Sequence, residues 1–295
     1  MRTHTAAAWV LAGPALAVIA VFFAVPVVAG LALSLTDFDL YALADLSTLR
    51  FVGLQNYARL LQTSLFWQAF GNTLYFVVVG VPVSVGLSLF AALLLHSRFV
   101  RWSGFFRTAL FAPVVTTVVA VAVIWRYLLH TRYGLINQAF ESIGLPPIDW
   151  LGDPHWSMPA IILFSAWKNF GYNMIILLAA LQSVPREVYE SARVDGAGAL
   201  RQFTDMTVPL LLPTLVMVGI MTVTGYFQLF AEPYVMTQGG PLRSTVSVLY
   251  FMYEEGFRWW NLGNASAVAF LLFVVIFAVS WVLLRFDRDP EGKPA

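Results

Sequence analysis

The chain of 295 residues contains no cysteine and little charge. Without cysteine it cannot form disulfides, thiolate metal sites or a thiol nucleophile. Charged residues make up 11% of the sequence, against roughly 25% in soluble domains. A formal net charge of +1, without any run of lysine or arginine, lacks the basic surface that nucleic acids require. The composition therefore excludes an ordinary soluble domain, and we expect no nucleic-acid partner.

The residue patterns that usually carry catalysis are also missing. Only two lysines occur, Lys168 and Lys293, and neither belongs to the G-x-x-x-x-G-K-[ST] pattern of a nucleotide-binding P-loop. The four histidines lie apart, without the H-E-x-x-H spacing of a zinc site, and the G-x-S-x-G pattern of a hydrolase is absent. We expect no enzyme activity and no metal or cofactor bound by this chain.

Hydrophobic residues make up 59% of the sequence, and the mean hydropathy is +0.76. A helix needs about 20 consecutive apolar residues to cross a bilayer. Six such stretches predict an all-α, polytopic membrane protein with a single domain over residues 1–295. The first stretch is longer than the apolar region of a signal peptide, so we expect it to remain as a transmembrane helix. The six predicted spans are 8–34, 69–95, 108–129, 157–183, 208–230 and 263–285.

No aspartate or glutamate lies in the middle of a predicted span. Proton-coupled transporters usually need such an intramembrane carboxylate. Uphill transport by this chain would therefore draw its energy from another subunit.

The distribution of basic residues predicts the topology. An even number of spans places both termini on one side, and lysine and arginine concentrate on the cytoplasmic side of a membrane. Ten such residues lie in the N-terminus, the loops 96–107 and 184–207 and the C-terminal segment, whose last part, 286–295, we expect to be a short solvated tail. The three opposite loops hold five. Both termini and the 184–207 loop should therefore face the cytoplasm.

The loops predicted to face outward, 35–68, 130–156 and 231–262, are rich in aromatic residues, as in LFWQAF, DWLGDPHW and FRWWNLGN. Aromatic residues at this depth are typical of an interfacial belt at the membrane surface. A binding surface for a partner protein is the alternative interpretation.

The loop 184–207 is polar in a chain that is otherwise apolar. Its first part predicts a helix that begins at Pro185, carries glutamates in its first turns and ends at a turn made by Gly196 and Gly198. A second short helix follows. Such a rigid, exposed helix-turn-helix is either a contact for a soluble partner or an ordinary connection between two spans.

This loop resembles the EAA signature of importer permeases of the ATP-binding-cassette class. That signature is E-A-A, three residues, G, nine residues and then I-x-L-P. Glu190-Ser191-Ala192, Gly196 and Met206-Thr207-Val208-Pro209 match its spacing. Serine, methionine and valine replace the second-position Ala, the Ile and the Leu of the pattern.

The resemblance extends over most of the chain. It is closest to the sugar-importer subgroup, which includes permeases for maltose and glycerol phosphate. The stretches that carry it are Asp195-Gly196-Ala197, ALQSVP at 180–185, Thr237 to Pro241 with Thr245, and the run from Tyr253 to Ala267.

The resemblance implies that the 184–207 loop holds a coupling helix, seated in a groove of a cytoplasmic ATPase. Glu190 would make a charged contact with that ATPase, and Gly196 would supply the turn. Ala192 and Ala197 would keep the helix narrow. The predicted coupling residues are Glu190, Ser191, Ala192, Asp195, Gly196 and Ala197.

The resemblance also implies the other parts of a complex in the plasma (inner) membrane of a bacterium or archaeon. A second, related permease would form a heterodimer with this chain. Two ATPases would use ATP and Mg, and an extracytoplasmic binding protein would deliver the solute.

Span four carries a lysine among several polar or aromatic side chains. Lysine at the bilayer centre costs roughly 2.5–3.5 kcal/mol on insertion scales, so Lys168 must face protein or a wet cavity. Aromatic faces suit sugar rings, and amides suit their hydroxyls. The predicted path residues are Trp167, Lys168, Asn169, Tyr172, Asn173, Tyr226, Gln228 and Glu232. In the alternative interpretation Lys168 pairs with Glu232 or with backbone carbonyls, and the asparagines only join helices.

We therefore predict a non-catalytic permease subunit of an ATP-driven importer, which forms the path for a sugar or sugar-like solute. A glycerol-phosphate-type cargo is the alternative within this class, although an anionic cargo would favour more positive charge along the path. A secondary transporter without an ATPase is the alternative outside the class. A membrane-embedded enzyme would need a cluster of His, Asp or Glu at the bilayer edge, and the sequence shows none.

Overall fold

The computed structural model describes residues 2–97, 100 and 102–285. Helices make up most of this part of the chain, in which extended pairing is limited to an isolated antiparallel bridge between Thr36 and Phe51. The all-α prediction is confirmed. The predicted tail 286–295 lies outside the described residues, as do Arg98 and Arg101 of the basic residues that predicted the topology.

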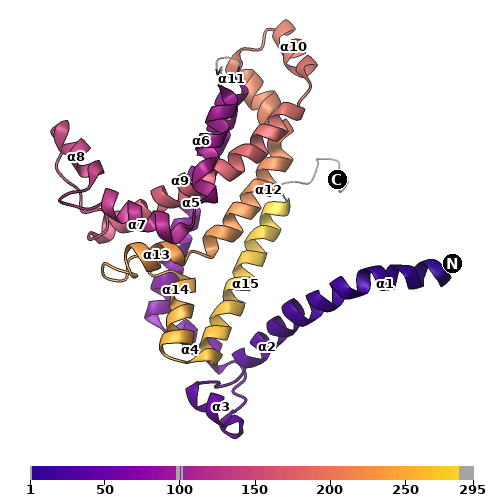
Figure 1. The fold of residues 1–295 in the computed structure, drawn as a ribbon, viewed down its shortest axis with the longest axis vertical. Coiled ribbons are helices and arrows are strands. Elements are labelled where there is room, and N and C mark those ends of the chain that lie inside the picture. The colour runs from indigo at the N-terminus through magenta and orange to yellow at the C-terminus, as the bar shows by residue number, and fades with distance from the viewer. Residues whose placement is uncertain (1, 98–99, 101, 286–295) are drawn as a thin grey trace. The chain divides into compact units, whose positions relative to one another are not determined.

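Figure 1 shows the helical elements along the chain. Of the short segments, η1, η3 and η4 are π-helical, and η2 is a 3-10 turn. In order, the elements are α1 Arg2–Ile19, η1 Ala20–Ala24, α2 Val25–Ser34, α3 Leu40–Ala44, η2 Leu46–Thr48, α4 Gln55–Gln62, α5 Ser64–His96, α6 Ser103–Val115, α7 Val118–Leu128, α8 Leu135–Ser142, α9 Pro154–Ser183, α10 Arg186–Val194, α11 Ala199–Gln202, η3 Phe203–Thr207, α12 Val208–Phe227, α13 Ala231–Met236, α14 Val248–Tyr253, η4 Glu254–Arg258 and α15 Leu262–Leu284.

Five of the six predicted spans are confirmed, and the third is a bent helix pair, either a broken span or a re-entrant loop. The five confirmed spans are continuous helical runs that are long and apolar enough to cross a membrane. The bent pair consists of α6 and α7. The fifth span begins earlier than expected, because α11, η3 and α12 follow one another without a break. The continuous runs are Trp9–Ser34, Ser64–His96, Pro154–Ser183, Ala199–Phe227 and Leu262–Leu284.

The break in the third span has a local cause in the sequence. The axis turns by 100° between α6 and α7, and Thr116 and Thr117 between them have extended backbones. Residues 114–119 are all β-branched, which lowers helix propensity, and Pro113 lies in the last turn of α6. The break leaves carbonyl groups at the end of α6 that need donors from elsewhere.

The chain divides into two compact units, residues 1–66 with 251–274 and residues 67–250 with 275–295. All candidate functional residues lie in the second unit. The prediction of one membrane domain over the whole chain stays a prediction.

In the first unit, the side chain of Asn56 holds α4 against the end of α2. Its Nδ2 donates to the carbonyls of Ser34 at 2.9 Å and Thr36 at 2.8 Å. Asn56 itself is buried, so the amide satisfies backbone groups that would otherwise lack partners after the helix ends.

The core of the second unit forms where α5, α9 and α12 pack together. In a bilayer such packing depends on close contact between helices rather than on removing apolar surface from water. Gly171 provides one such contact, because a Cβ at this position would overlap the Leu110 carbonyl oxygen of α6. The buried core side chains are Ala91, Ala92, Leu95, Met174, Leu177, Leu178, Leu181, Leu211 and Val218.

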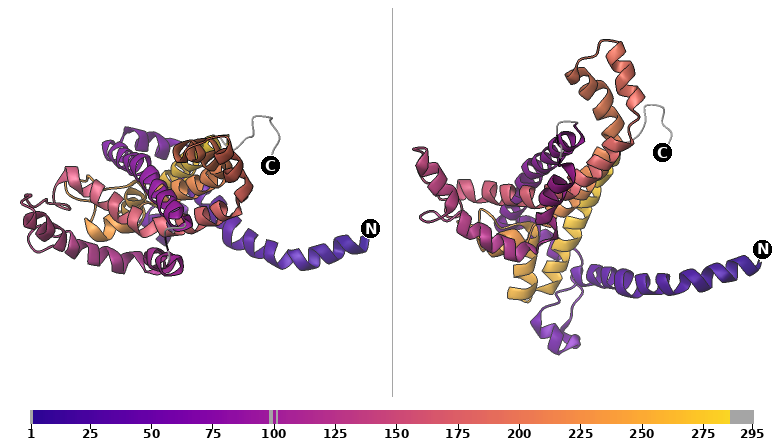
Figure 2. Two further views of the ribbon diagram at one scale, coloured as in Figure 1. Left: turned by 90° about the horizontal axis from the view of Figure 1, so that it is seen from above. Right: turned by 45° about the horizontal axis from the view of Figure 1, so that its top comes forward.

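α9 is the central helix of this unit, and a side-chain cap marks its start. The Asp153 carboxylate accepts the His155 N–H at 2.8 Å. That hydrogen bond holds the pKa of the Asp153 carboxyl below its usual value. α10 connects the other end of α9 to the start of the α11–α12 run. It forms a projection far from α13, as Figure 1 and the right view of Figure 2 show.

Candidate functional site

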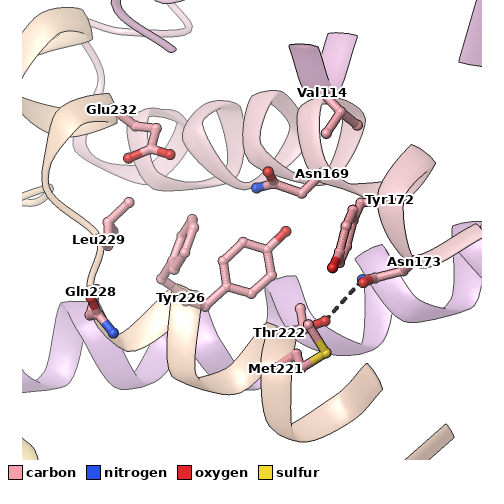
Figure 3. Close-up of a pocket in the computed structure, with 12 residues that line it drawn as sticks. Val114, Asn169, Tyr172, Asn173, Met221, Thr222, Tyr226, Gln228, Leu229 and Glu232 are labelled. Carbon is pink, nitrogen blue, oxygen red and sulfur yellow. Dashed lines mark hydrogen bonds between the residues drawn. The ribbon is translucent and has the colours of Figure 1, made fainter. Parts of the chain in front are cut away.

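A polar cavity of about 370 Å³ opens among α5, α6, α9, α12 and α13. Its volume falls within the roughly 300–1,000 Å³ that is common for ligand sites. Figure 3 shows carboxylate, amide and hydroxyl groups from three of these helices around one space. The lining residues are Phe76, Val114, Asn169, Tyr172, Asn173, Met221, Thr222, Gly225, Tyr226, Gln228, Leu229 and Glu232.

α9 contributes a polar stripe to the polar cavity. Asn169, Tyr172 and Asn173 are three and four residues apart, so they share one face of the helix. Asn173 is buried and donates from Nδ2 to Thr222 Oγ1 at 2.9 Å, which joins α9 to α12. Tyr172 is 45% exposed. Asn173 therefore serves helix packing, while its two neighbours remain accessible to a ligand.

Tyr226 on α12 presents a phenol at the cavity wall. Its ring packs edge-to-face on Phe76, with centroids 4.8 Å apart. The residue is buried, and its hydroxyl faces the Ser84 and Asn169 side chains without forming a hydrogen bond of normal geometry to either. Buried hydroxyls without partners are rare in folded proteins. A ligand hydroxyl at this position would supply the missing hydrogen bond.

Glu232 on α13 directs its carboxylate toward the polar cavity (Figure 3). α13 is held against α7 by Arg126, whose Nη1 donates to the Val235 carbonyl at 3.2 Å. No described residue forms an ion pair with Glu232 within 4.0 Å, although Lys168 attracts it over a longer distance. The described part of the chain also holds no group of three or more His, Asp or Glu that could bind a metal ion.

The structure brings together six of the eight predicted path residues. They come from α9, the end of α12 and the start of α13, and they line one cavity although about 60 residues of sequence separate the first from the last. Contact of these residues with a cargo stays a prediction. The six are Asn169, Tyr172, Asn173, Tyr226, Gln228 and Glu232.

Lys168, the seventh path residue, closes the break in the third span and does not line the cavity. Its Nζ donates to the carbonyls of Pro113 at 3.3 Å and Thr116 at 3.1 Å, and the residue is 8% exposed. A positive charge beside the C-terminal end of α6 is also favoured by the helix dipole. These contacts agree with the alternative interpretation, in which Lys168 pairs with backbone carbonyls.

Trp167, the eighth path residue, lines a different cavity of about 500 Å³ between α5, α6 and α9. Its ring lies 5.4 Å from that of Trp125, centroid to centroid. Apart from the Trp167 indole, the side chains that line this second cavity have no hydrogen-bonding group. The second cavity is therefore unsuited to sugar hydroxyls.

α10 and the turn after it form a rigid projection. The Ala197 N–H donates to the Ala192 carbonyl at 2.9 Å, and Gly196 between them has a φ of 78°. This left-handed conformation costs other residues roughly 1–2 kcal/mol, so glycine is the residue expected there. The Tyr189 hydroxyl lies 3.1 Å from Thr207 Oγ1 and ties α10 to η3.

Most of the predicted coupling residues are exposed on this projection. Glu190, Ser191, Asp195 and Gly196 are exposed, Ala197 is half-buried and Ala192 is buried. Two apolar neighbours that the sequence interpretation did not assign to a contact surface, Val194 and Leu200, are 88% and 77% exposed. They lie on either side of the glycine turn. Large apolar residues beside a turn in a polar segment are the signal that identifies them as further contact candidates.

The stretch from Thr237 to Thr245, which carries part of the resemblance, forms a compact turn on α5. The hydroxyls of Thr237 and Thr245 lie 2.7 Å apart. Asn72 on α5 donates to the carbonyls of Arg243 and Val246, each at 3.0 Å. These bonds hold the turn in one conformation.

Comparison with known proteins gives consistent matches over nearly the whole chain. Residues 6–291 match the family described as binding-protein-dependent transport system inner membrane component. The lactose transport system permease protein LacF of Rhizobium radiobacter is 35% identical, covering 99% of this chain and 97% of that protein. The sn-glycerol-3-phosphate transport system permease protein UgpA of Yersinia pseudotuberculosis is 30% identical, with 94% and 93% covered.

A solved structure shares the fold. It is a bacterial alginate ABC transporter in complex with an alginate pentasaccharide-bound periplasmic protein. The TM-score is 0.78 at 22% identity, and the match covers 97% of this chain and 95% of the other.

Proposed function

Because this chain belongs to the family of inner membrane components of binding-protein-dependent transport systems, we propose that it forms the sugar path of an ATP-driven importer and that α10 couples this path to a cytoplasmic ATPase. The resemblance to the sugar-importer permeases, first seen in the EAA spacing, is confirmed. The lactose and glycerol-phosphate relatives support a sugar or sugar-like cargo.

The polar cavity carries the proposal. Asn169 offers an amide, Tyr226 a hydroxyl and Glu232 a carboxylate, while Phe76 and Tyr172 add aromatic faces. Amides and aromatic faces around a partly apolar cavity suit a polyhydroxylated ring. In this arrangement the cargo would pass between α9, α12 and α13.

The α10 projection supports the coupling role. Its turn is fixed by Gly196, and Tyr189 holds the helix to the start of span five, so a force on α10 would reach α12 directly. Glu190 would make the charged contact with the ATPase, and Val194 and Leu200 would add apolar surface. Movement of the ATPases would thereby change the packing around the cavity.

We assign the remaining tasks to other subunits. Two ATPases would bind ATP and Mg and hydrolyse the ATP, and this chain would contribute no catalytic residue. A second, related permease would complete the path as a heterodimer. A binding protein would deliver the sugar on the side remote from α10, in line with the periplasmic protein bound to the alginate transporter. Both termini would then face the cytoplasm.

The test begins with purification of the complex through a tag on this chain, followed by reconstitution in liposomes. ATP hydrolysis is measured with the binding protein and a panel of sugars. We expect one or a few sugars to stimulate hydrolysis and to be taken up. Asn169→Ala should raise the sugar concentration for half-maximal uptake about tenfold, because one hydrogen bond of about 1.4 kcal/mol is lost. Gln182→Ala, an exposed residue on the same helix, is the control.

Two outcomes would contradict the proposal. Purification of the chain without an ATPase, together with uptake that survives ATP depletion and stops when an ion gradient is removed, would indicate a secondary transporter. Equal uptake by the Asn169→Ala and Gln182→Ala variants would show that the sugar does not pass through the polar cavity.

A further inference from the structure

We infer that the polar cavity selects uncharged sugars and rejects cargo that carries phosphate, sulfonate or carboxylate groups, and that Glu232 is responsible. This inference rests on the proposed function, because it assumes that cargo passes through the cavity. It narrows that function, since similarity to relatives named for lactose and for glycerol 3-phosphate leaves the charge of the cargo open.

The charged groups near the cavity favour this selection. Glu232 is the one acidic residue among the lining residues, which include no lysine, arginine or histidine. The Lys168 ammonium is directed to the Pro113 and Thr116 carbonyls, more than 4.0 Å from the Glu232 carboxylate. Among the described residues no cation therefore stands at the cavity wall to pair with an anion.

Arg126 lies on α7, which packs against the short helix that carries Glu232, and its guanidinium also has a backbone partner. Its guanidinium donates to the Val235 carbonyl at 3.2 Å, on the same short helix as Glu232. This bond positions α13 and with it the carboxylate. Arg126 is not among the lining residues of the cavity.

The neutral groups of the cavity complement hydroxyls better than they complement anions. A sugar hydroxyl can donate one hydrogen bond and accept others, whereas a phosphate or carboxylate at neutral pH chiefly accepts. Glu232 accepts charge-assisted hydrogen bonds from hydroxyls. An anion bound to the Tyr226 hydroxyl and the Asn169 amide would share the cavity with the Glu232 carboxylate.

The size of the effect follows from the distance and the surroundings. Two like charges about 4 Å apart, at an effective dielectric constant of about 20, correspond to roughly thousandfold weaker binding. Water in the open cavity and the longer-range attraction of Lys168 reduce this value. Burial also raises the pKa of the Glu232 carboxyl, which lowers its negative charge and reduces the value further. We expect a preference for neutral over anionic cargo of roughly 10- to 100-fold.

The absence of cysteine from this chain allows the charge of the cavity to be measured without knowing the cargo. Met221→Cys introduces one thiol at the cavity wall. The purified complex is treated with neutral methyl methanethiosulfonate or with the anionic sulfonatoethyl reagent, and mass spectrometry follows labelling of this chain alone. The labelling rate of the anionic reagent is divided by that of the neutral reagent, and this ratio is compared with the same ratio for free cysteine. Changes in the reactivity of the thiol affect both reagents and therefore cancel.

We expect the anionic reagent to be disfavoured about tenfold or more in the Met221→Cys chain. Adding Glu232→Gln should remove most of this difference, whereas Glu232→Asp should retain it. Glu141→Gln, at an exposed glutamate of α8 outside the cavity, should leave the ratio unchanged. An equal ratio with and without Glu232→Gln would overturn the inference.

Protection of the same thiol by solutes separates this inference from the proposed function. Lactose, maltose and trehalose are compared with their phosphate esters, and a neutral sugar should protect where its ester does not. If the thiol reacts selectively with the neutral reagent but no sugar protects it, the cavity is acidic and the proposed sugar path is wrong. Equal protection by a sugar and its phosphate ester would keep the path and overturn the selection of neutral cargo.

Discussion

Replacing Lys168 with methionine should loosen the break in the third span without removing a cargo contact. Two charge-assisted hydrogen bonds, to the Pro113 and Thr116 carbonyls, would be lost, and each is worth about 1.5–3 kcal/mol. The substitution also removes the cost of placing an ammonium group within the membrane, which is roughly 2.5–3.5 kcal/mol on insertion scales. The central values, about 4.5 kcal/mol lost and about 3 kcal/mol relieved, leave a net local destabilisation of about 1.5 kcal/mol.

Hydrogen exchange in the purified complex measures this change where it occurs. Amides of residues 116–120 should exchange about tenfold faster in Lys168→Met, since 1.4 kcal/mol corresponds to a factor of ten. Sugar affinity should stay within about twofold of the wild type, because the ammonium does not line the polar cavity. Lys293→Met, at the other lysine of the chain, is the control.

The opposite pattern would refute the assignment. If exchange at the break were unchanged and sugar affinity fell tenfold or more, the Lys168 ammonium would contact cargo. The interpretation of Lys168 as a path residue would then hold, and the two carbonyl contacts would be incidental.

Two further predictions concern glycines and have matched controls. Gly196→Ala should weaken the α10 turn by about 1–2 kcal/mol through its φ of 78° alone, since no atom lies within 4 Å of the added Cβ. Sugar-stimulated ATP hydrolysis by the assembled complex should fall severalfold in Gly196→Ala. Gly198→Ala is the control and should retain activity, because φ of Gly198 is −68°. Equal ATP hydrolysis by the two variants would contradict the coupling role. Gly171→Ala should push α6 from α9 by overlap with the Leu110 carbonyl and cost about 1–3 kcal/mol, seen as a lower melting temperature of the complex. Gly219→Ala, with open space around it, should melt like the wild type, and an equal melting temperature for Gly171→Ala would show that the two helices have room to spare.

The spans and the α10 turn could be predicted from the sequence because their causes are local. A bilayer requires about 20 apolar residues in a helix whatever the helix packs against, so composition alone locates a span. The same holds for Gly196, because a left-handed turn favours glycine in any tertiary context. The β-branched run at 114–119 was an equally local signal for the break in the third span. Hydropathy hides this signal, since valine and threonine barely interrupt an apolar stretch.

In contrast, the tertiary structure decided which residues line the polar cavity. Trp167, Lys168 and Asn169 are consecutive on α9. Trp167 lines an apolar cavity, Lys168 contacts carbonyls at the end of α6, and Asn169 lines the polar cavity. Successive side chains on a helix differ in direction by about 100°, and nothing in their chemistry states which direction faces a ligand. The rotation of α9 is set by its contacts with α5, α6 and α12, which come from distant parts of the chain. The sequence therefore determined which residues could serve a sugar path, and helix packing determined which of them share one cavity.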